Sequence, residues 1–192
     1  MNQPIRMFPR ALIFAAAMVL IVTVSAPGHT FISEGHGWGG AGVANLHHEA
    51  PTAAGWWGPV VHGGLVINLS DFWRVGIDAG AGHHFQREDD GETIGPHSVV
   101  STGLEARYAL DIVTYVPYIG LGVGIHPLGP PSNTMPQGEL ATFRATIGLD
   151  YRHSREWSFG AAAQLHTPMT QPADFPHYST LRVHVGYHFR RF

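Results

Sequence analysis

Three histidines with matching positions in their segments are the first residues that suggest chemistry. His84, His126 and His166 each stand near the end of a stretch of alternating residues, on its polar side, and a long connection follows. An acidic run from Glu88 to Glu92 follows the first of them. Imidazoles bind zinc, copper and nickel, whereas carboxylates suit calcium or magnesium. The sequence thus allows a divalent-metal site at these histidines, with ordinary polar side chains of a histidine-rich chain as the alternative.

Charged residues form a second group with regular spacing. They fall at alternate positions, opposite apolar residues: Arg74, Asp78, Glu105, Arg107, Arg144, Asp150, Arg152 and Arg182. If this side of each segment faces a confined interior, the charges must be paired or solvated, because an isolated charge away from water is very costly. We therefore predict an internal network of salt bridges. All eleven basic residues are arginine, whose planar guanidinium suits paired carboxylates.

The last segment, Tyr178 to Phe192, indicates which element positions such residues. Apolar and polar residues alternate from Leu181 to Arg190, which is the period of a strand with one apolar and one polar face. In a soluble sandwich the apolar face would be the core, whereas in a membrane barrel it would face lipid and the polar face would line the interior. The same alternation recurs along the chain, with aromatic residues at strand ends. We therefore predict a closed barrel in lipid.

The first 26 residues have the character of a targeting segment. Arg6 and Arg10 precede an uncharged run from Ala11 to Ala26, and the run ends in small residues. A basic start, a short apolar core and a small-residue end are typical of a secretory signal peptide, which is helical before removal. An uncleaved anchor is the alternative, although the run is shorter than the ~20 residues of a spanning helix. We predict a signal peptide at 1–26, a short leader at 27–35 and a barrel domain at 36–192.

Composition limits the remaining function classes. The chain has no cysteine, which excludes a lipoprotein anchor and a disulfide framework. Its net charge is −3 and its basic residues do not cluster, so nucleic acid is not an expected partner. Only 13% of the residues are charged, against about a quarter in soluble domains. No later stretch is long and apolar enough for a spanning helix, so a membrane protein would have to cross with strands.

The lengths of the connections predict the topology. Long connections at 47–55, 87–97, 127–139 and 168–177 alternate with short ones at 70–72, near 111 and at 153–156. Outer-membrane barrels have short periplasmic turns and long external loops. A glycine-rich segment near 36–46 completes eight strands if it is the first strand, and without it seven remain. Glycine disfavours regular strand pairing, so the prediction of this strand rests on the number of strands that the barrel needs.

Two stretches carry a resemblance to a known family. The ending Tyr187-His188-Phe189 looks like the terminal strand of bacterial outer-membrane barrels, although Arg190, Arg191 and Phe192 follow it. Residues 107–124 resemble the central hairpin of small outer-membrane barrel domains. The chain from about 36 onward thus resembles the small, eight-stranded bacterial outer-membrane β-barrel family. This resemblance implies an all-β, antiparallel up-and-down transmembrane barrel in the outer membrane of a Gram-negative bacterium.

The resemblance also implies partners and a function. Expected partners are outer-membrane lipid and the barrel-assembly machinery, which would recognise Tyr187, Phe189 and Phe192. An extracellular ligand or a divalent cation is a further candidate. An eight-stranded barrel has room only for its own side chains, so we predict a plugged lumen. The predicted role is structural, adhesive or interactive, through long external loops, with no enzymatic activity and no cofactor.

Two alternative functions follow from the same resemblance. One is a narrow passage for small apolar compounds. The other is a barrel enzyme that modifies membrane lipid, because His177 and Ser179 have the His-x-Ser spacing of the lipid A deacylase type. Thr180 stands where that motif has asparagine, and no carboxylate is placed by sequence to orient the imidazole.

Overall fold

The structure is a computed structural model, and it describes residues 34–47, 56–85, 87–89, 92–94, 97–110, 114–127, 139–169 and 177–190. The strands are β1 (Glu34–His47), β2 (Trp56–Asn68), β3 (Trp73–His84), β4 (Arg87–Asp89), β5 (Glu92–Ile94), β6 (His97–Ala109), β7 (Tyr115–Pro127), β8 (Glu139–Arg152), β9 (Trp157–Pro168) and β10 (His177–Arg190). Across these ranges, no helix is long and apolar enough to cross a membrane. The predicted signal peptide lies outside the described residues.

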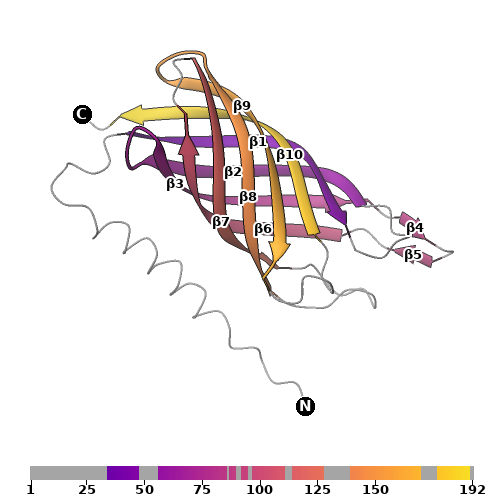
Figure 1. Ribbon diagram of the computed structural model, residues 1–192. Coiled ribbons are helices and arrows are strands. Elements are labelled where there is room, and N and C mark those ends of the chain that lie inside the picture. The colour runs from indigo at the N-terminus through magenta and orange to yellow at the C-terminus, as the bar shows by residue number, and fades with distance from the viewer. Residues whose placement is uncertain are drawn as a thin grey trace. The chain divides into compact units, whose positions relative to one another are not determined.

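Eight of the strands form a closed antiparallel barrel in the order β1-β10-β9-β8-β7-β6-β3-β2 (Figure 1). The first and last strands close it, with a continuous register from Glu34 opposite Arg190 to His47 opposite His177. Every barrel strand pairs with its neighbour along the chain, apart from this closure and the interruption by β4 and β5. The predicted eight-stranded up-and-down barrel is therefore confirmed, including the glycine-rich first strand.

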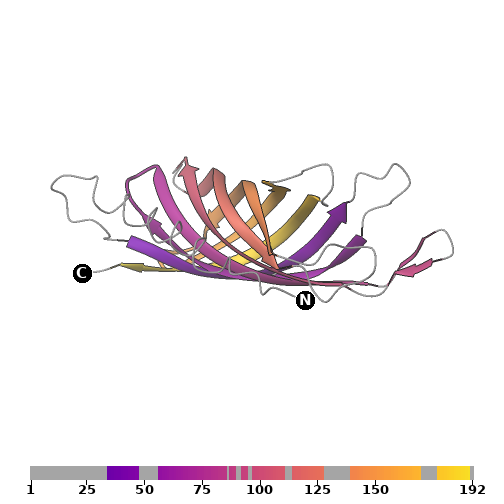
Figure 2. The same cartoon turned by 90° about the horizontal axis from the view of Figure 1, so that it is seen from below.

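The structure differs from the prediction at several strand ends and in one connection. β1 begins at Glu34, so Glu34 and Gly35 belong to the barrel and not to the leader. β9 continues through Thr167 to Pro168, where the sequence suggested the start of a loop. The polar connection after β3 contains a two-stranded hairpin, β4–β5, that pairs with no barrel strand. Figures 1 and 2 show this hairpin beyond the ends of β3 and β6, at the end of the barrel away from the C-terminal end of β10.

Two of the short connections use the same turn chemistry. Ser70 Oγ accepts hydrogen bonds from the backbone N–H groups of Phe72 and Trp73, the latter at 3.0 Å. Ser154 Oγ accepts in the same way from Glu156 and Trp157. A serine hydroxyl that bonds the backbone two and three residues on replaces part of a backbone turn. We call the barrel end with these short connections the turn end, and the opposite end the loop end.

Side chains alternate between the two faces of the wall, as the period of two requires. On β3 the burial alternates regularly from Asp78 to His84, and β9 shows a similar alternation. The buried faces point into the lumen, which takes the place of a core. The apolar part of the lumen forms two clusters, Ala44, Leu46, Val60, Val99 and Tyr178 at the loop end, and Ala109, Val116, Tyr118 and Ala162 nearer the turn end. Polar and charged side chains occupy the space between them.

Candidate functional site in the barrel lumen

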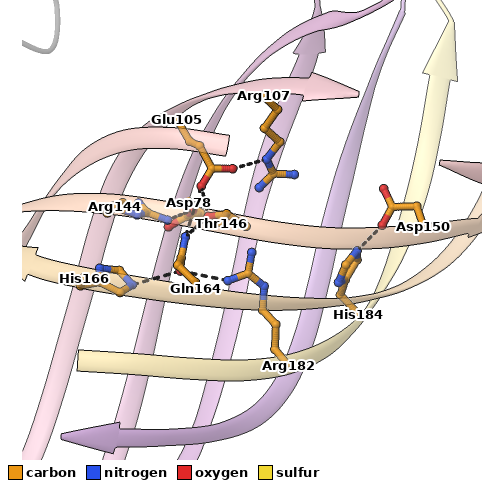
Figure 3. Close-up of polar contacts among 10 residues, drawn as sticks. All are labelled: Asp78, Glu105, Arg107, Arg144, Thr146, Asp150, Gln164, His166, Arg182 and His184. Atoms are coloured by element: carbon orange, nitrogen blue, oxygen red, sulfur yellow. Dashed lines mark hydrogen bonds and ion pairs between the residues drawn. The ribbon is translucent and has the colours of Figure 1, made fainter. Parts of the chain in front are cut away.

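Glu105 lies at the centre of the polar network in the lumen (Figure 3). Its Oε1 forms a buried ion pair with Nε of Arg107 on the same strand. Its Oε2 accepts hydrogen bonds from Thr146 Oγ1 on β8 and from Gln164 Nε2 on β9, the latter at 3.3 Å. A buried carboxylate that accepts from three donors keeps its charge without water. The network therefore ties β6 to strands on the other side of β7.

Gln164 connects this carboxylate to a second cation. Its Oε1 accepts from Arg182 Nη1 at 3.0 Å and from His166 Nε2 at 3.1 Å. The guanidinium of Arg182, a residue only 1% exposed, lies 4.7 Å from the ring centroid of Trp38. An aromatic face attracts a cation, most strongly where water is excluded. Arg182 is thus held by an amide oxygen and an indole ring, and Nε2 of the same amide donates to Glu105.

A second buried ion pair joins Asp78 on β3 to Arg144 on β8 (Figure 3). The two residues are 66 positions apart in the chain, and their side chains meet across the lumen. The guanidinium of Arg144 lies over Gly103, where a Cβ would overlap its Nη1. The same pattern recurs for Glu105 over Gly120. At these two inward glycines, a large polar side chain from another strand occupies the space that a Cβ would need.

Nearer the turn end, Asp150 pairs with a histidine. His184 Nε2 donates to Asp150 Oδ1 at 2.8 Å. Below this pair, the rings of His36 and His188 lie 4.7 Å apart, and His188 Nε2 is 2.9 Å from Ser158 Oγ. Charged and titratable groups therefore line the lumen down to its turn end.

The predicted charge network takes the following form. The structure joins Glu105 with Arg107 and Asp78 with Arg144, and links Arg182 to Glu105 through Gln164. Asp150 forms its hydrogen bond with His184. Arg74 is buried on the inner face of β3, and Arg152 is half-buried on the inner face of β8.

At the loop end the three predicted metal ligands do come together, around an aromatic ring. The ring centroids of His84, His126 and His166 lie 5.9, 5.3 and 5.4 Å from that of Tyr178. His126 and His166 also touch each other, with centroids 4.4 Å apart and perpendicular planes. In the part of the chain that the structure describes, no group of three or more His, Asp or Glu is placed to hold a metal ion. The metal site therefore stays a prediction.

The outer face of the barrel is apolar over its middle. Ile119, Leu121 and Ile147 are each at least 60% exposed, and they lie side by side in the strand register. Aromatic rings gather at the turn end, where Trp73 packs against Tyr108 and Trp157 against Tyr187. A polar interior, an apolar outer belt and an aromatic girdle are the arrangement of a transmembrane barrel.

Comparison with known proteins agrees with this arrangement. No protein-family model matches the chain, and no curated protein matches it by sequence. Among solved structures, the chain is similar to Neisserial surface protein A, with a TM-score of 0.63 and 12% identity over 81% of this chain and 97% of the other. The N-terminal β-barrel domain of OprF from Pseudomonas aeruginosa gives a TM-score of 0.58, with 13% identity over 83% of this chain and 100% of the other. The outer membrane protein OprG from the same organism gives 0.57, with 14% identity over 84% and 99%.

The fold is that of a small bacterial outer-membrane β-barrel. The fold and the apolar belt together indicate the outer-membrane location that the sequence predicts. In an outer-membrane barrel the turn end is periplasmic and the loop end external.

The predicted assembly signal lies partly within the described barrel. Tyr187 and Phe189 point outward from β10, with 48% and 43% of their surfaces exposed. Phe192 lies outside the described residues, and recognition by an assembly machinery stays a prediction.

The predicted His-x-Ser pair lies on the outer-membrane barrel's loop end. His177 and Ser179 share one face of β10, opposite the inward Tyr178. A pair that the sequence did not suggest lies on the outer face of β3 and β6, where His83 Nδ1 is 3.2 Å from Ser98 Oγ. Neither pair makes a catalytic site by itself, because a serine nucleophile also needs an oriented base and donors for the developing oxyanion.

Several lumen residues escaped the sequence analysis. Trp38, Thr146, Gln164 and Tyr178 all take part in the contacts described above. Each shares the inward parity of the charged residues on its strand, and this was the signal that could have identified them. These residues carry no charge, so their signal in the sequence is weaker than that of Arg, Asp or Glu. An amide nevertheless offers both hydrogen-bond donors and an acceptor.

Proposed function

We propose that this protein is an outer-membrane barrel with a plugged lumen, and that it acts in the cell envelope through its external connections. The role would be structural, adhesive or interactive. The observation that supports this proposal is the packed network around Glu105. Thr146 and Gln164 complete the coordination of its carboxylate, and Arg182 and Trp38 fill the adjacent space.

The packing argues against free flow of ions through the barrel. An ion that crossed would have to displace buried pairs such as Asp78–Arg144, and each separated charge would then lie in a medium of low dielectric. The interior of an eight-stranded barrel is only wide enough for its own side chains. In this proposal the barrel is a rigid anchor, and the connections at the loop end make the interactions with other molecules.

A planar-bilayer experiment with the refolded chain tests this proposal. We expect no steady ionic conductance from the wild-type barrel at neutral pH. A variant that removes the plug, Glu105→Ala with Arg107→Ala and Arg182→Ala, should conduct if it folds. Steady conductance of the wild type would overturn the plugged-lumen proposal. In parallel, liposomes containing the barrel should take up small apolar compounds no faster than empty liposomes, and faster uptake would favour the alternative role as a narrow passage.

A further inference from the structure

The outer face of the barrel is hollowed along β9. Two outward residues in the middle of this strand, Ala161 and Ala163, are small and exposed. Their partners in the strand register are large apolar residues: Leu149 and Ile147 on β8, and Val183 and Leu181 on β10. The alanines therefore form the floor of a groove between two ridges, on strands that lie side by side (Figure 1). The groove has a volume of about 600 Å³, which is in the range of small-molecule sites, and mainly apolar side chains line it.

A second groove adjoins the first on the outer face. Gly39 and Ala41 of β1 lie at its floor, next to β10. Apart from its chain neighbours, a Cβ at Gly39 would meet nothing closer than the backbone oxygen of His62 at 4.0 Å, so this floor is open. The volume is about 710 Å³, and both grooves are lined by Leu149 and Ala161. Two apolar grooves thus lie next to each other within the lipid-facing belt.

Towards the turn end, the second groove reaches the aromatic girdle. Tyr115 and Tyr151 line it there, with ring centroids 5.4 Å apart. Tyrosine rings in such girdles lie at the level of the lipid headgroups. The β8–β9 turn carries two exposed residues of opposite charge, Arg155 and Glu156. His153 of the same turn has its ring centroid 6.3 Å from that of Tyr151, so the turn adjoins the end of the groove.

These features fit a lipid that has two chains and a headgroup with both signs of charge. A flexible acyl chain can fill a narrow groove, whereas the convex wall of a second barrel would leave voids, and each void loses dispersion contacts. A guanidinium suits a phosphate, and a carboxylate suits an amine. Because the turn end of an outer-membrane barrel is periplasmic, the lipid would belong to the periplasmic leaflet.

We propose that the outer face from β7 to β10 and on to β1 binds one zwitterionic diacyl phospholipid of the periplasmic leaflet. One acyl chain lies in each groove. The headgroup lies at the β8–β9 turn, with its phosphate at Arg155 and its amine at Glu156. Contacts with the floor and both walls of each groove, together with the headgroup contacts, retain this lipid longer than the lipids around the rest of the belt. The site lies outside the barrel wall, so it does not depend on the plugged lumen.

Native mass spectrometry of the full chain, refolded in mild detergent with phosphatidylethanolamine as the probe, tests the site. We expect one retained lipid on each wild-type barrel. Ala161→Leu with Ala163→Leu fills the floor of the first groove and should weaken binding by about tenfold. Arg155→Gln should also weaken binding, because it removes the cation for the phosphate. The single-chain form of the same lipid should bind less tightly than the diacyl form, since it occupies only one groove.

The matched control is Ala79→Leu with Ala81→Leu, which changes two outward alanines of β3 that line neither groove. This variant should bind the lipid like the wild type. If the first double variant does not fold, as judged by the heat-dependent shift in gel mobility, Ala161→Leu alone should weaken binding.

Three results would overturn the lipid site. They are a wild-type barrel that retains no phospholipid, equal binding by the two double variants, and tighter binding of lipid A than of phosphatidylethanolamine. A wild-type dimer without retained lipid would assign the grooves to a second copy of the chain and would also overturn the proposal. Conductance of the wild type would overturn the plugged lumen and leave the lipid site standing.

Discussion

At the scale of single residues, the lumen is stabilised by charges that share partners. Glu105 accepts from Arg107, Thr146 and Gln164, so removing it affects three strands at once. A buried ion pair contributes little compared with an apolar pair of the same shape, but a single member that is left alone is strongly destabilising. The lumen should therefore tolerate the loss of a pair better than the loss of one partner.

Glu105→Ala should lower the free energy of unfolding in detergent by about 3 to 5 kcal/mol, because Arg107 would remain as a buried cation without its carboxylate. The double variant Glu105→Ala with Arg107→Ala should be less destabilised than the sum of the two single variants. A coupling of about 0.5 to 3 kcal/mol is expected from urea unfolding of the four proteins. Strictly additive effects would mean that the two groups are solvated independently.

At the scale of the strands, some glycines on the inner face leave room for large side chains of other strands. Tyr118 of β7 lies directly over Gly148 of β8, so a Cβ at Gly148 would overlap its ring. On the outer face, by contrast, a Cβ at Gly37 would meet Leu65 Cδ2 at 3.5 Å and the backbone oxygen of Gly64 at 4.0 Å, which are ordinary contact distances. The two glycines therefore differ in function although both lie in strands.

Gly148→Ala should destabilise the barrel by about 1 to 3 kcal/mol, because the rigid ring of Tyr118 must move in a packed interior. Gly37→Ala is the control and should be neutral or slightly stabilising, since alanine loses less backbone entropy on folding than glycine. Thermal unfolding followed by the heat-dependent shift in gel mobility measures both. If both variants unfold like the wild type, the lumen is looser than the contacts indicate.

The repeated Ser-x-x-Trp turns allow a second prediction at this scale. Ser154→Ala removes two hydrogen bonds, from the N–H groups of Glu156 and Trp157, and should cost about 0.5 to 1.5 kcal/mol. Ser70→Ala should have a similar effect, because its geometry is the same. Ser154→Asp retains an acceptor and should restore most of the loss in the same unfolding measurement. Equal losses for alanine and aspartate would show that the side-chain acceptor is unimportant.

At the scale of the whole molecule, most large apolar side chains face lipid instead of a protein core. They point outward from the barrel wall, whereas most charged side chains of the strands point inward. The cost of an outward charge should therefore depend on its depth in the bilayer and not on its exposure in the isolated barrel. Ile147 and Trp57 suit this comparison, because they are 63% and 61% exposed but lie near the middle and near the loop end of their strands.

Ile147→Arg should reduce the stability of the barrel in bilayers by about 2 to 4 kcal/mol, as expected for arginine at the midplane. Trp57→Arg should cost only about 0 to 1 kcal/mol beyond the loss of the indole itself, for which Trp57→Ala is the reference. Folding titrations in lipid vesicles give both values. Equal costs at the two positions would contradict the placement of the belt in the bilayer.

The sequence by itself determined the strands of the barrel wall and the side of the wall on which each residue lies. Alternation with a period of two is a local property, so it identified the strands and told inward residues such as Arg144 from outward ones such as Ile147. The alternating lengths of the connections fixed an antiparallel up-and-down order, and the even strand count included β1 despite its glycines. Strand ends such as Glu34 and Pro168 were missed, because hydrophobic patterns fade where a strand leaves its neighbours.

Only the tertiary structure decided which side chains meet inside that wall. The strand pattern placed Asp78, Arg144 and Asp150 on the inner face, but it did not show that Asp78 contacts Arg144 or that Asp150 contacts His184. It also did not show that Tyr178 would be the centre of the histidine cluster. Such contacts depend on the stagger of the closed barrel, which brings residues of non-neighbouring strands to the same height in the lumen. The alternation of residues along a strand decides which face of the wall a side chain lies on, whereas closure of the barrel decides which side chains it contacts.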